Sequence, residues 1–314
     1  MPRPQIAIIG AGDIGGTIAH LIALKELGDI ILFDIVPGLA QGKALDISES
    51  FPIERLDCFI KGTNKYEDIQ NSDVVIVTAG LRRTPGMTPF DLLDGSSKII
   101  REIAPNIKKH CPQAFIIVVS NPLDAMVWLF QKESGLPHHR VVGMAGVLDC
   151  ARYSYFLAKE LKVSVKSVAG ASLGGHREIA VPLPHRSSVA GISLPDLVKM
   201  GWTTYERLDA IVKHTREAGG EIANLLQTKT AYYAPASATV AMVKAYLKDE
   251  KRIFPCAVWL NGEYGIKDFY FGVPVVLGAG GVEKIVEIDL SPEERAMFDE
   301  SLAKVREMVK AIKP

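Results

Sequence analysis

The sequence has no surplus of charge of either sign. Its 36 lysines and arginines are matched by 36 aspartates and glutamates, so its composition does not favour nucleic acid or an anionic membrane as a partner. No apolar run is long enough to cross a bilayer, and the chain passes from MPRPQ directly into an apolar segment, so we expect no signal peptide. Repeats and long linkers are also absent, so we expect the two halves of the chain to share an extensive interface.

Cysteine is scarce. The four cysteines lie singly, with no C-x-x-C pair, at positions 58, 111, 150 and 256. This pattern is typical of reduced thiols in a cytosolic protein, so we expect a cytoplasmic location and no metal site. The rest of the composition is ordinary: 314 residues, 48% apolar and 23% charged, are typical of a globular protein with one large or two medium domains.

The clearest pattern lies in residues 5–34. An apolar run at 6–9 has the length of a buried strand, and the spacing G-x-G-x-x-G follows at 10–15. Apolar residues then recur at helical spacing up to Gly28, which we expect to end the helix as a C′ glycine. A second apolar strand at 30–33 leads to an aspartate, so strand, glycines, helix, strand and acid occur in the order of a dinucleotide-binding unit.

Each part of this unit has a physical reason. Gly10 allows a sharp turn, Gly12 leaves room for a pyrophosphate, and Gly15 lets the helix pack closely on the strand. The free N–H groups at the helix N-terminus suit an anion. Asp34, nineteen residues after Gly15, can accept the ribose hydroxyls and would repel a 2′-phosphate, so we expect NAD and not NADP. The alternative is a structural turn with no ligand.

Strands and helices alternate through the first half of the chain. Strands are expected at 58–60, 73–78, 114–119 and 140–143, and helices at 39–47, 90–110 and 123–132. This alternation predicts an α/β fold with a Rossmann-type, doubly wound parallel sheet. The pattern changes near Gly146, so we expect an NAD-binding domain over residues 1–145 and a mixed α+β substrate domain over residues 146–314.

The second half mixes long helices with short strands. Helices are expected at 147–161, 194–200, 205–226 and 236–247, and strands at 253–260 and 269–277 resemble an antiparallel pair. The last helix has a clear start: Ser291 is expected as N-cap, Pro292 as the first helical residue and Glu294 as the reciprocal acid of a capping box.

Four polar residues are candidates for chemistry. Asn121 follows the end of a strand, where its amide could donate to a substrate oxygen, although it could equally be a turn former before proline. Asp149 and Arg152 lie three apart on one helical face, a spacing that also suits a plain surface ion pair. His176, expected at the start of a short strand, could take a proton from an alcohol near neutral pH. Their spacing alone does not bring these residues together.

Several longer motifs occur in order along essentially the whole chain. They are the glycine fingerprint with its aspartate, A-G-x-x-R-x-P-G-M, S-N-P-L-D, G-M-A-G-V-L-D-x-A-R and L-G-G-H. Together they resemble the lactate/malate dehydrogenase superfamily, and most of all its lactate-dehydrogenase-like malate dehydrogenases. The resemblance implies NAD-dependent, reversible oxidation of L-malate to oxaloacetate, an activity of the tricarboxylic acid cycle, by a homotetramer or dimer acting on a small dicarboxylate.

The resemblance also implies a role for each candidate. His176 corresponds to the family's proton-relay histidine and Asp149 to its partner acid. Arg152 corresponds to the arginine that binds the C1 carboxylate, and Arg83 to the arginine that recognises the second carboxylate. Asn121 corresponds to the amide that contacts substrate and cofactor. The cofactor contacts expected in total are Gly10, Ala11, Gly12, Asp13, Ile14, Gly15, Asp34, Val119 and Asn121.

Three positions near the expected site depart from the family pattern. A second loop arginine, which polarises the reacting carbonyl, is replaced by Pro89, so we expect impaired turnover. Ser96 replaces an asparagine, which weakens a cofactor contact. Arg177 replaces a glycine after the histidine and could substitute for the missing loop arginine, but in a strand its side chain would point to the opposite face, so we do not expect it to reach the substrate. Two alternatives therefore stay open: a related 2-hydroxyacid dehydrogenase, or an NAD-binding protein with a relict site.

Overall fold

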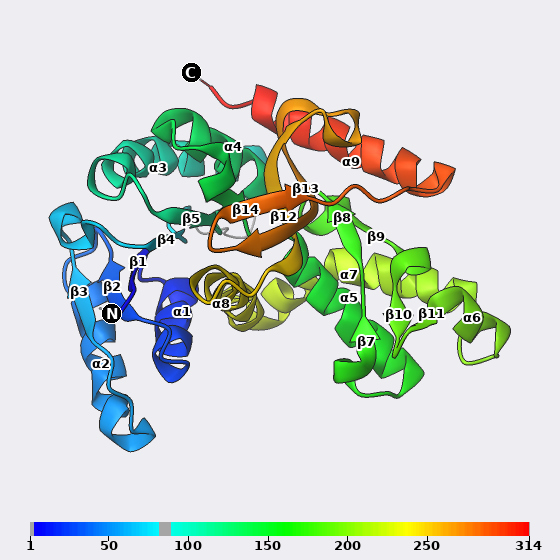
Figure 1. Ribbon diagram of the computed structural model, residues 1–314, viewed down its shortest axis with the longest axis horizontal. Coiled ribbons are helices and arrows are strands. Elements are labelled where there is room, and N and C mark those ends of the chain that lie inside the picture. The colour runs from blue at the N-terminus through cyan, green and yellow to red at the C-terminus, as the bar shows by residue number, and fades with distance from the viewer. Residues whose placement is uncertain (1–2, 82–88, 314) are drawn as a thin grey trace.

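A computed structural model describes residues 3–81 and 89–313, without the side chains of residues 89 and 90. One sheet of nine strands runs through it in the order β14-β13-β12-β6-β5-β4-β1-β2-β3 (Figure 1). Its parallel part consists of β1 (Gln5–Ile9), β2 (Asp29–Phe33), β3 (Ile60–Thr63), β4 (Val74–Val77), β5 (Phe115–Val118) and β6 (Val141–Gly143). The strand order reverses between β1 and β4, where doubly wound sheets bind ligands. The predicted Rossmann-type architecture is confirmed.

Helices cover both faces of the parallel part of this sheet, which is why its central strands β4 and β5 are apolar at every position. Ile6 and Ile8 face one core together with α1 (Asp13–Leu24), α2 (Leu39–Glu54) and α8 (Tyr233–Leu247). Ala7 and Ile9 face the other core with α3 (Pro89–His110) and α4 (Leu123–Ser134). Figure 1 shows these two helix layers on opposite sides of the strands. A sheet covered in this way binds its ligands at the carboxyl ends of the strands.

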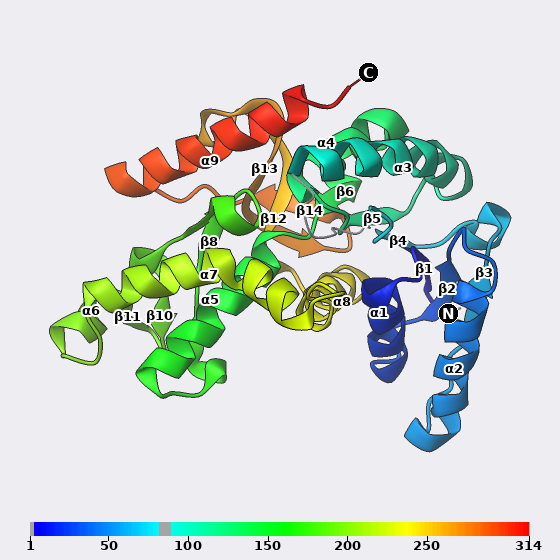
Figure 2. The same cartoon turned by 180° about the vertical axis from the view of Figure 1, so that it is seen from behind.

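The second half of the chain is mixed α+β, as the sequence predicts. Its long helices α5 (Gly146–Leu161) and α7 (Tyr205–Leu226) lie side by side, away from β1–β3 (Figure 2). Short strands accompany them: β7 (Val168–Ala169), β10 (Ser188–Val189) and β11 (Ile192–Ser193) form one sheet, and β8 (Ser172–Gly174) pairs with β9 (Ala180–Pro182). Helix α6 (Leu194–Lys199) follows, and α9 (Pro292–Lys310) closes the chain. The predicted capping box of α9, formed by Ser291 and Glu294, is confirmed.

The two halves share one sheet. Strands β12 (Arg252–Asn261), β13 (Lys267–Gly278) and β14 (Gly281–Ile285) are antiparallel, and Ala257 of β12 pairs with Gly143 of β6. The predicted antiparallel pair is confirmed, but it extends the first half's sheet instead of standing apart. This shared sheet ties the catalytic candidates of the second half firmly to the first.

One glycine has a different role from the predicted one. Helix α1 ends at Leu24, and Glu26, not Gly28, takes the left-handed conformation, with φ 46°. Gly28 instead permits close backbone packing, because a Cβ there would lie 2.3 Å from the carbonyl oxygen of Pro4. Two bounds also shift: α2 continues to Glu54, and β3 begins at Ile60.

Two further observations concern the chain as a whole. The four cysteines, all within the described part of the chain, are free thiols. Between residues 3 and 81 and between 89 and 313, no helix is both long and apolar enough to cross a membrane.

Candidate active site

The glycine turn lies at the point where the strand order reverses. Gly10 has φ 107°, and a Cβ on it would lie 2.8 Å from the hydroxyl oxygen of Thr78. A Cβ on Gly15 would lie 1.8 Å from the carbonyl oxygen of Gly10, so helix and strand touch there as predicted. Around Gly12, by contrast, the first 4 Å are open. The turn is therefore closed on its protein side and open where a pyrophosphate would approach.

The carboxylate of Asp34 lies beside this turn. Its Oδ2 accepts the backbone N–H of Ala11 at 2.7 Å, and its Oδ1 accepts that of Val36 at 3.0 Å. Each carboxylate oxygen keeps a second lone pair for a ribose hydroxyl. A cavity of about 160 Å³ extends from Gly12 to Asn121 and is also lined by Val119. These residues fit a dinucleotide.

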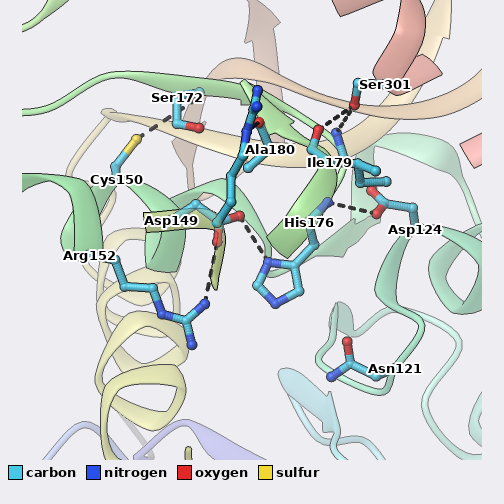
Figure 3. A network of polar contacts seen from close by, with 12 residues as sticks. Asn121, Asp124, Asp149, Cys150, Arg152, Ser172, His176, Ile179, Ala180 and Ser301 are labelled. Atoms are coloured by element: carbon cyan, nitrogen blue, oxygen red, sulfur yellow. Dashed lines mark hydrogen bonds and ion pairs between the residues drawn. The ribbon is translucent and has the colours of Figure 1, made fainter. Parts of the chain in front are cut away.

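His176 and Asp149 come from different elements and meet. Nδ1 of His176 lies 2.9 Å from Oδ2 of Asp149, and both side chains are buried (Figure 3). An ionised carboxylate only accepts hydrogen bonds, so we assign the ring proton to Nδ1. The Nε2 atom then carries a lone pair, which is the arrangement required of a general base.

Arg152 completes the group. Its Nη1 lies 3.6 Å from Oδ1 of Asp149, with the side chains only 9% and 2% exposed. The surface ion pair that the sequence left open is therefore excluded, because solvent hardly reaches either group. Burial lowers the pKa of Arg152, an effect that Asp149 and Glu178 oppose. A buried guanidinium beside a single carboxylate suits a second, substrate-derived anion.

Asn121 lies across the ring from Arg152 in Figure 3. A cavity of about 40 Å³ is lined by Asn121, Arg152 and His176 together. The side chain of Asn121 donates one long hydrogen bond, 3.5 Å from Nδ2 to the carbonyl oxygen of Val119. Three of the four candidates thus line one small cavity beside the dinucleotide cavity, and the fourth, Asp149, contacts two of them, His176 and Arg152.

Sequence reasoning missed Asp124, three residues after Asn121. Its Oδ2 accepts the backbone N–H of His176 at 2.9 Å, while Oδ1 is buried and has no hydrogen-bond partner among the described residues. Burial raises its pKa from 3.8 to about 6. Ser301 of α9 adds a second anchor, since its hydroxyl accepts the N–H of Gly175 and donates to the carbonyl of Ile179. The available signal was an acid among the buried apolar residues of α4.

Asp124 should make stability depend on pH. At pH values below 3.8 the carboxyl is neutral in both states; as pH rises to about 6 the unfolded chain ionises first, so stability falls. An Asp124→Asn variant lacks this loss. We expect the difference in free energy of unfolding, variant minus wild type, to rise by about 1 kcal/mol between pH 5 and pH 7. Denaturant unfolding at both pH values measures this, and parallel profiles would contradict it.

The prediction that His176 starts a strand containing Arg177 is wrong. His176 precedes a short 3-10 turn, η4 (Arg177–Ile179), and β9 begins only at Ala180. Arg177 has φ 66°, so strand alternation does not apply to it. Its side chain lines the same 40 Å³ cavity as His176 and Asn121.

The structure gives less detail on the other two departures from the family pattern, Ser96 and Pro89, and on Arg83. Ser96 is buried, and its hydroxyl accepts the N–H of Leu81 at 3.3 Å. Arg83 lies outside the described residues, and Pro89 is described only as the first residue of α3. Their roles stay predictions.

Two family profiles together match nearly the whole chain. The lactate/malate dehydrogenase, NAD binding domain, matches residues 4–143, and the lactate/malate dehydrogenase, alpha/beta C-terminal domain, matches residues 146–313. A malate dehydrogenase of Roseobacter denitrificans is 56% identical over 313 residues, which are 100% of this chain and 98% of that protein.

Solved structures show the same fold. A malate dehydrogenase of Cryptosporidium parvum is 45% identical, with a TM-score of 0.96 over 98% of each chain. A lactate dehydrogenase of the same organism, solved with lactic acid and its nicotinamide adenine dinucleotide cofactor, is also 45% identical, with a TM-score of 0.96 over 99% of this chain and 98% of that one. Backbone similarity therefore does not separate the two substrates.

Proposed function

Because the chain belongs to the lactate/malate dehydrogenase family, with that family's NAD-binding domain as its first half, we propose that it is an NAD-dependent malate dehydrogenase. It would interconvert L-malate and oxaloacetate. The observation that carries the proposal is the buried contact of 2.9 Å between His176 and Asp149, with Arg152 lying 3.6 Å from the same carboxylate. A base, its partner acid and a carboxylate-binding cation are the groups that oxidation of a 2-hydroxy acid needs.

The residues would divide the work as follows. The glycine turn and Asp34 hold NAD, whose chemistry is to accept a hydride in oxidation and to donate one in reduction. Arg152 binds the C1 carboxylate with two parallel hydrogen bonds. Nε2 of His176 takes the proton of the C2 hydroxyl, and Asp149 stabilises the imidazolium that results. The amide of Asn121 donates to the same oxygen.

The choice of malate over lactate rests on Arg83 and on the relative from Roseobacter denitrificans, which is named a malate dehydrogenase. A lactate-like preference stays the second candidate, because a lactate dehydrogenase is as similar in structure as a malate dehydrogenase. Steady-state assays of NADH oxidation with oxaloacetate and with pyruvate decide between them. We expect oxaloacetate to be the better substrate.

Arg83→Gln tests the specificity directly. A hydrogen-bonded ion pair with the second carboxylate contributes about 1.5–3 kcal/mol, so kcat/KM for oxaloacetate should fall roughly 10–100-fold. Pyruvate lacks that carboxylate, and its kcat/KM should fall much less. Equal losses with both substrates would remove Arg83 from this role. Binding of NADH without turnover of either substrate by the wild type would support the relict site instead.

Asp34 should set the cofactor preference. In the wild type, NADH should bind more tightly than NADPH, because the carboxylate accepts the ribose hydroxyls and repels a 2′-phosphate. Asp34→Ser should weaken NADH binding at least about tenfold, the lower limit for a hydrogen bond to a charged group, and should bring the two affinities together. Calorimetric titration measures both constants. Equal wild-type affinities would refute the assignment.

We further infer a cytoplasmic location and self-association as a homotetramer or dimer. The scattered free cysteines support the first, and the family resemblance supports the second. Sedimentation at assay concentrations would test the oligomeric state.

A further inference from the structure

Arg177 places a second guanidinium beside the catalytic histidine. It lines the cavity of about 40 Å³ with Asn121, Arg152 and His176. It also lines the dinucleotide cavity of about 160 Å³, which contains Gly12 and Asn121. Arg177 therefore lies where the two cavities meet, which is where the reacting carbon of a substrate must face the cofactor.

The backbone at this residue is held in an unusual state. Arg177 has φ 66°, in the left-handed region that costs an ordinary residue about 1 kcal/mol or more. The surrounding loop is well anchored: Asp124 accepts the N–H of His176, and Ser301 binds both Gly175 and Ile179. This left-handed turn breaks the strand alternation, so that two successive side chains line one cavity.

The reaction would be helped by a second cation in this cavity, besides Arg152. Arg152 is paired with Asp149 and would bind the C1 carboxylate. During reduction of a 2-oxo acid, negative charge grows on the C2 oxygen until His176 delivers its proton. A cation held against that oxygen stabilises the transition state more than the ground state.

We propose that the guanidinium of Arg177 contacts the C2 oxygen of the substrate and polarises the reacting carbonyl. The proposal rests on the proposed function, since it names a further catalytic residue of the same site. In the reduction, the hydride adds to C2, the carbonyl electron pair moves to oxygen beside Arg177, and His176 supplies the proton. Arg177 itself gains and loses nothing.

Arg177→Gly is the test, because glycine removes the cation and tolerates the left-handed backbone. We expect kcat for oxaloacetate to fall roughly 10²–10³-fold, the usual effect of removing one such donor. Reduction of pyruvate should fall by a similar factor. Millimolar guanidinium ion should restore part of the lost rate. Arg55→Gly is the matched control: Arg55 is exposed, has φ 56°, and caps α2 away from the site.

Binding of oxamate, a stable analogue of a 2-oxo acid, provides a readout without turnover. Its affinity for the NADH complex, followed by nicotinamide fluorescence, should weaken at least tenfold in Arg177→Gly and not in Arg55→Gly. If the wild type binds oxamate through Arg177 but reduces no 2-oxo acid, the proposed function is refuted, whereas the contact between Arg177 and a 2-oxo acid is not.

Three results would overturn the role of Arg177. They are a kcat within threefold of the wild type with unchanged oxamate binding, a loss confined to oxaloacetate, and a loss that guanidinium does not restore. A loss confined to oxaloacetate would mean that Arg177 binds the distal carboxylate. A loss that guanidinium does not restore would mean that Arg177 supports the structure of the loop. Pro89→Arg gives an independent check: it should raise kcat of Arg177→Gly at least tenfold but that of the wild type much less. A gain of tenfold or more in the wild type would contradict the proposal.

Discussion

Replacing His176 by asparagine should lower kcat for oxaloacetate reduction by about 10³–10⁴, the upper part of the range that general acid–base catalysis supplies. The imidazole ring is the proposed base. Its Nδ1 lies 2.9 Å from Asp149, and this contact is the reason for assigning the ring proton to Nδ1. Asparagine keeps a polar side chain of similar reach but cannot carry a proton to and from the substrate at neutral pH. Steady-state rates with NADH at saturation measure the loss.

Cofactor binding should survive this change. The cofactor cavity of about 160 Å³ is lined by Gly12, Val119 and Asn121, and His176 is not among its lining residues. We therefore expect the NADH affinity of His176→Asn to stay within about twofold of the wild type. His139→Asn is the matched control, because His139 is exposed and outside both cavities. Turnover retained by His176→Asn would exclude it as the proton carrier.

Asp149→Asn should have the second largest effect, a loss of up to about 10⁴ in kcat, as the same change causes in other carboxylate–histidine pairs. The amide can donate a hydrogen bond to Nδ1, which moves the ring proton to Nε2, where the lone pair is needed. The acid acts through the histidine, so its loss should not exceed that of His176→Asn.

A second consequence distinguishes Asp149 from a purely structural acid. Its Oδ1 lies 3.6 Å from Arg152, so the variant also changes the environment of the carboxylate-binding guanidinium. We expect KM for oxaloacetate to change in Asp149→Asn but not in His176→Asn. The double variant should be hardly slower than the worse single one, because the two side chains act as a unit. Additive losses would mean that they act separately.

The local pattern of the first thirty-four residues was enough to predict the cofactor site. Strand, glycines and acid lie close together in the chain, so the motif that they form can be read from the local sequence. The role predicted for Gly28, by contrast, is wrong. Its position suggested a helix end, whereas a backbone contact with Pro4 explains it, and such a contact leaves no trace in local periodicity.

The sequence pattern did not predict the contacts between distant segments of the chain. His176 and Asp124 are 52 residues apart and Gly175 and Ser301 are 126 apart, so only the folded chain brings them together. Resemblance supplied the pairing of His176 with Asp149, but not the burial that makes it a candidate relay. Asp124 was overlooked because an acid in a helix is normally solvated, although the apolar residues around it in α4 were an available signal.

By itself, then, the sequence determined the chemical groups available to this protein: a dinucleotide turn, an acid for the ribose, a histidine with two candidate partners, and a cation next to it. The tertiary structure alone decided where those groups point. Arg177 makes the difference plain. A strand would have turned it away from His176, but Arg177 has a left-handed φ of 66° and lines the same cavity. Side chains of α4 and α9 hold the two residues before it by hydrogen bonds. Side-chain direction depends on the backbone conformation of each residue, and tertiary contacts set that conformation wherever local propensity is weak.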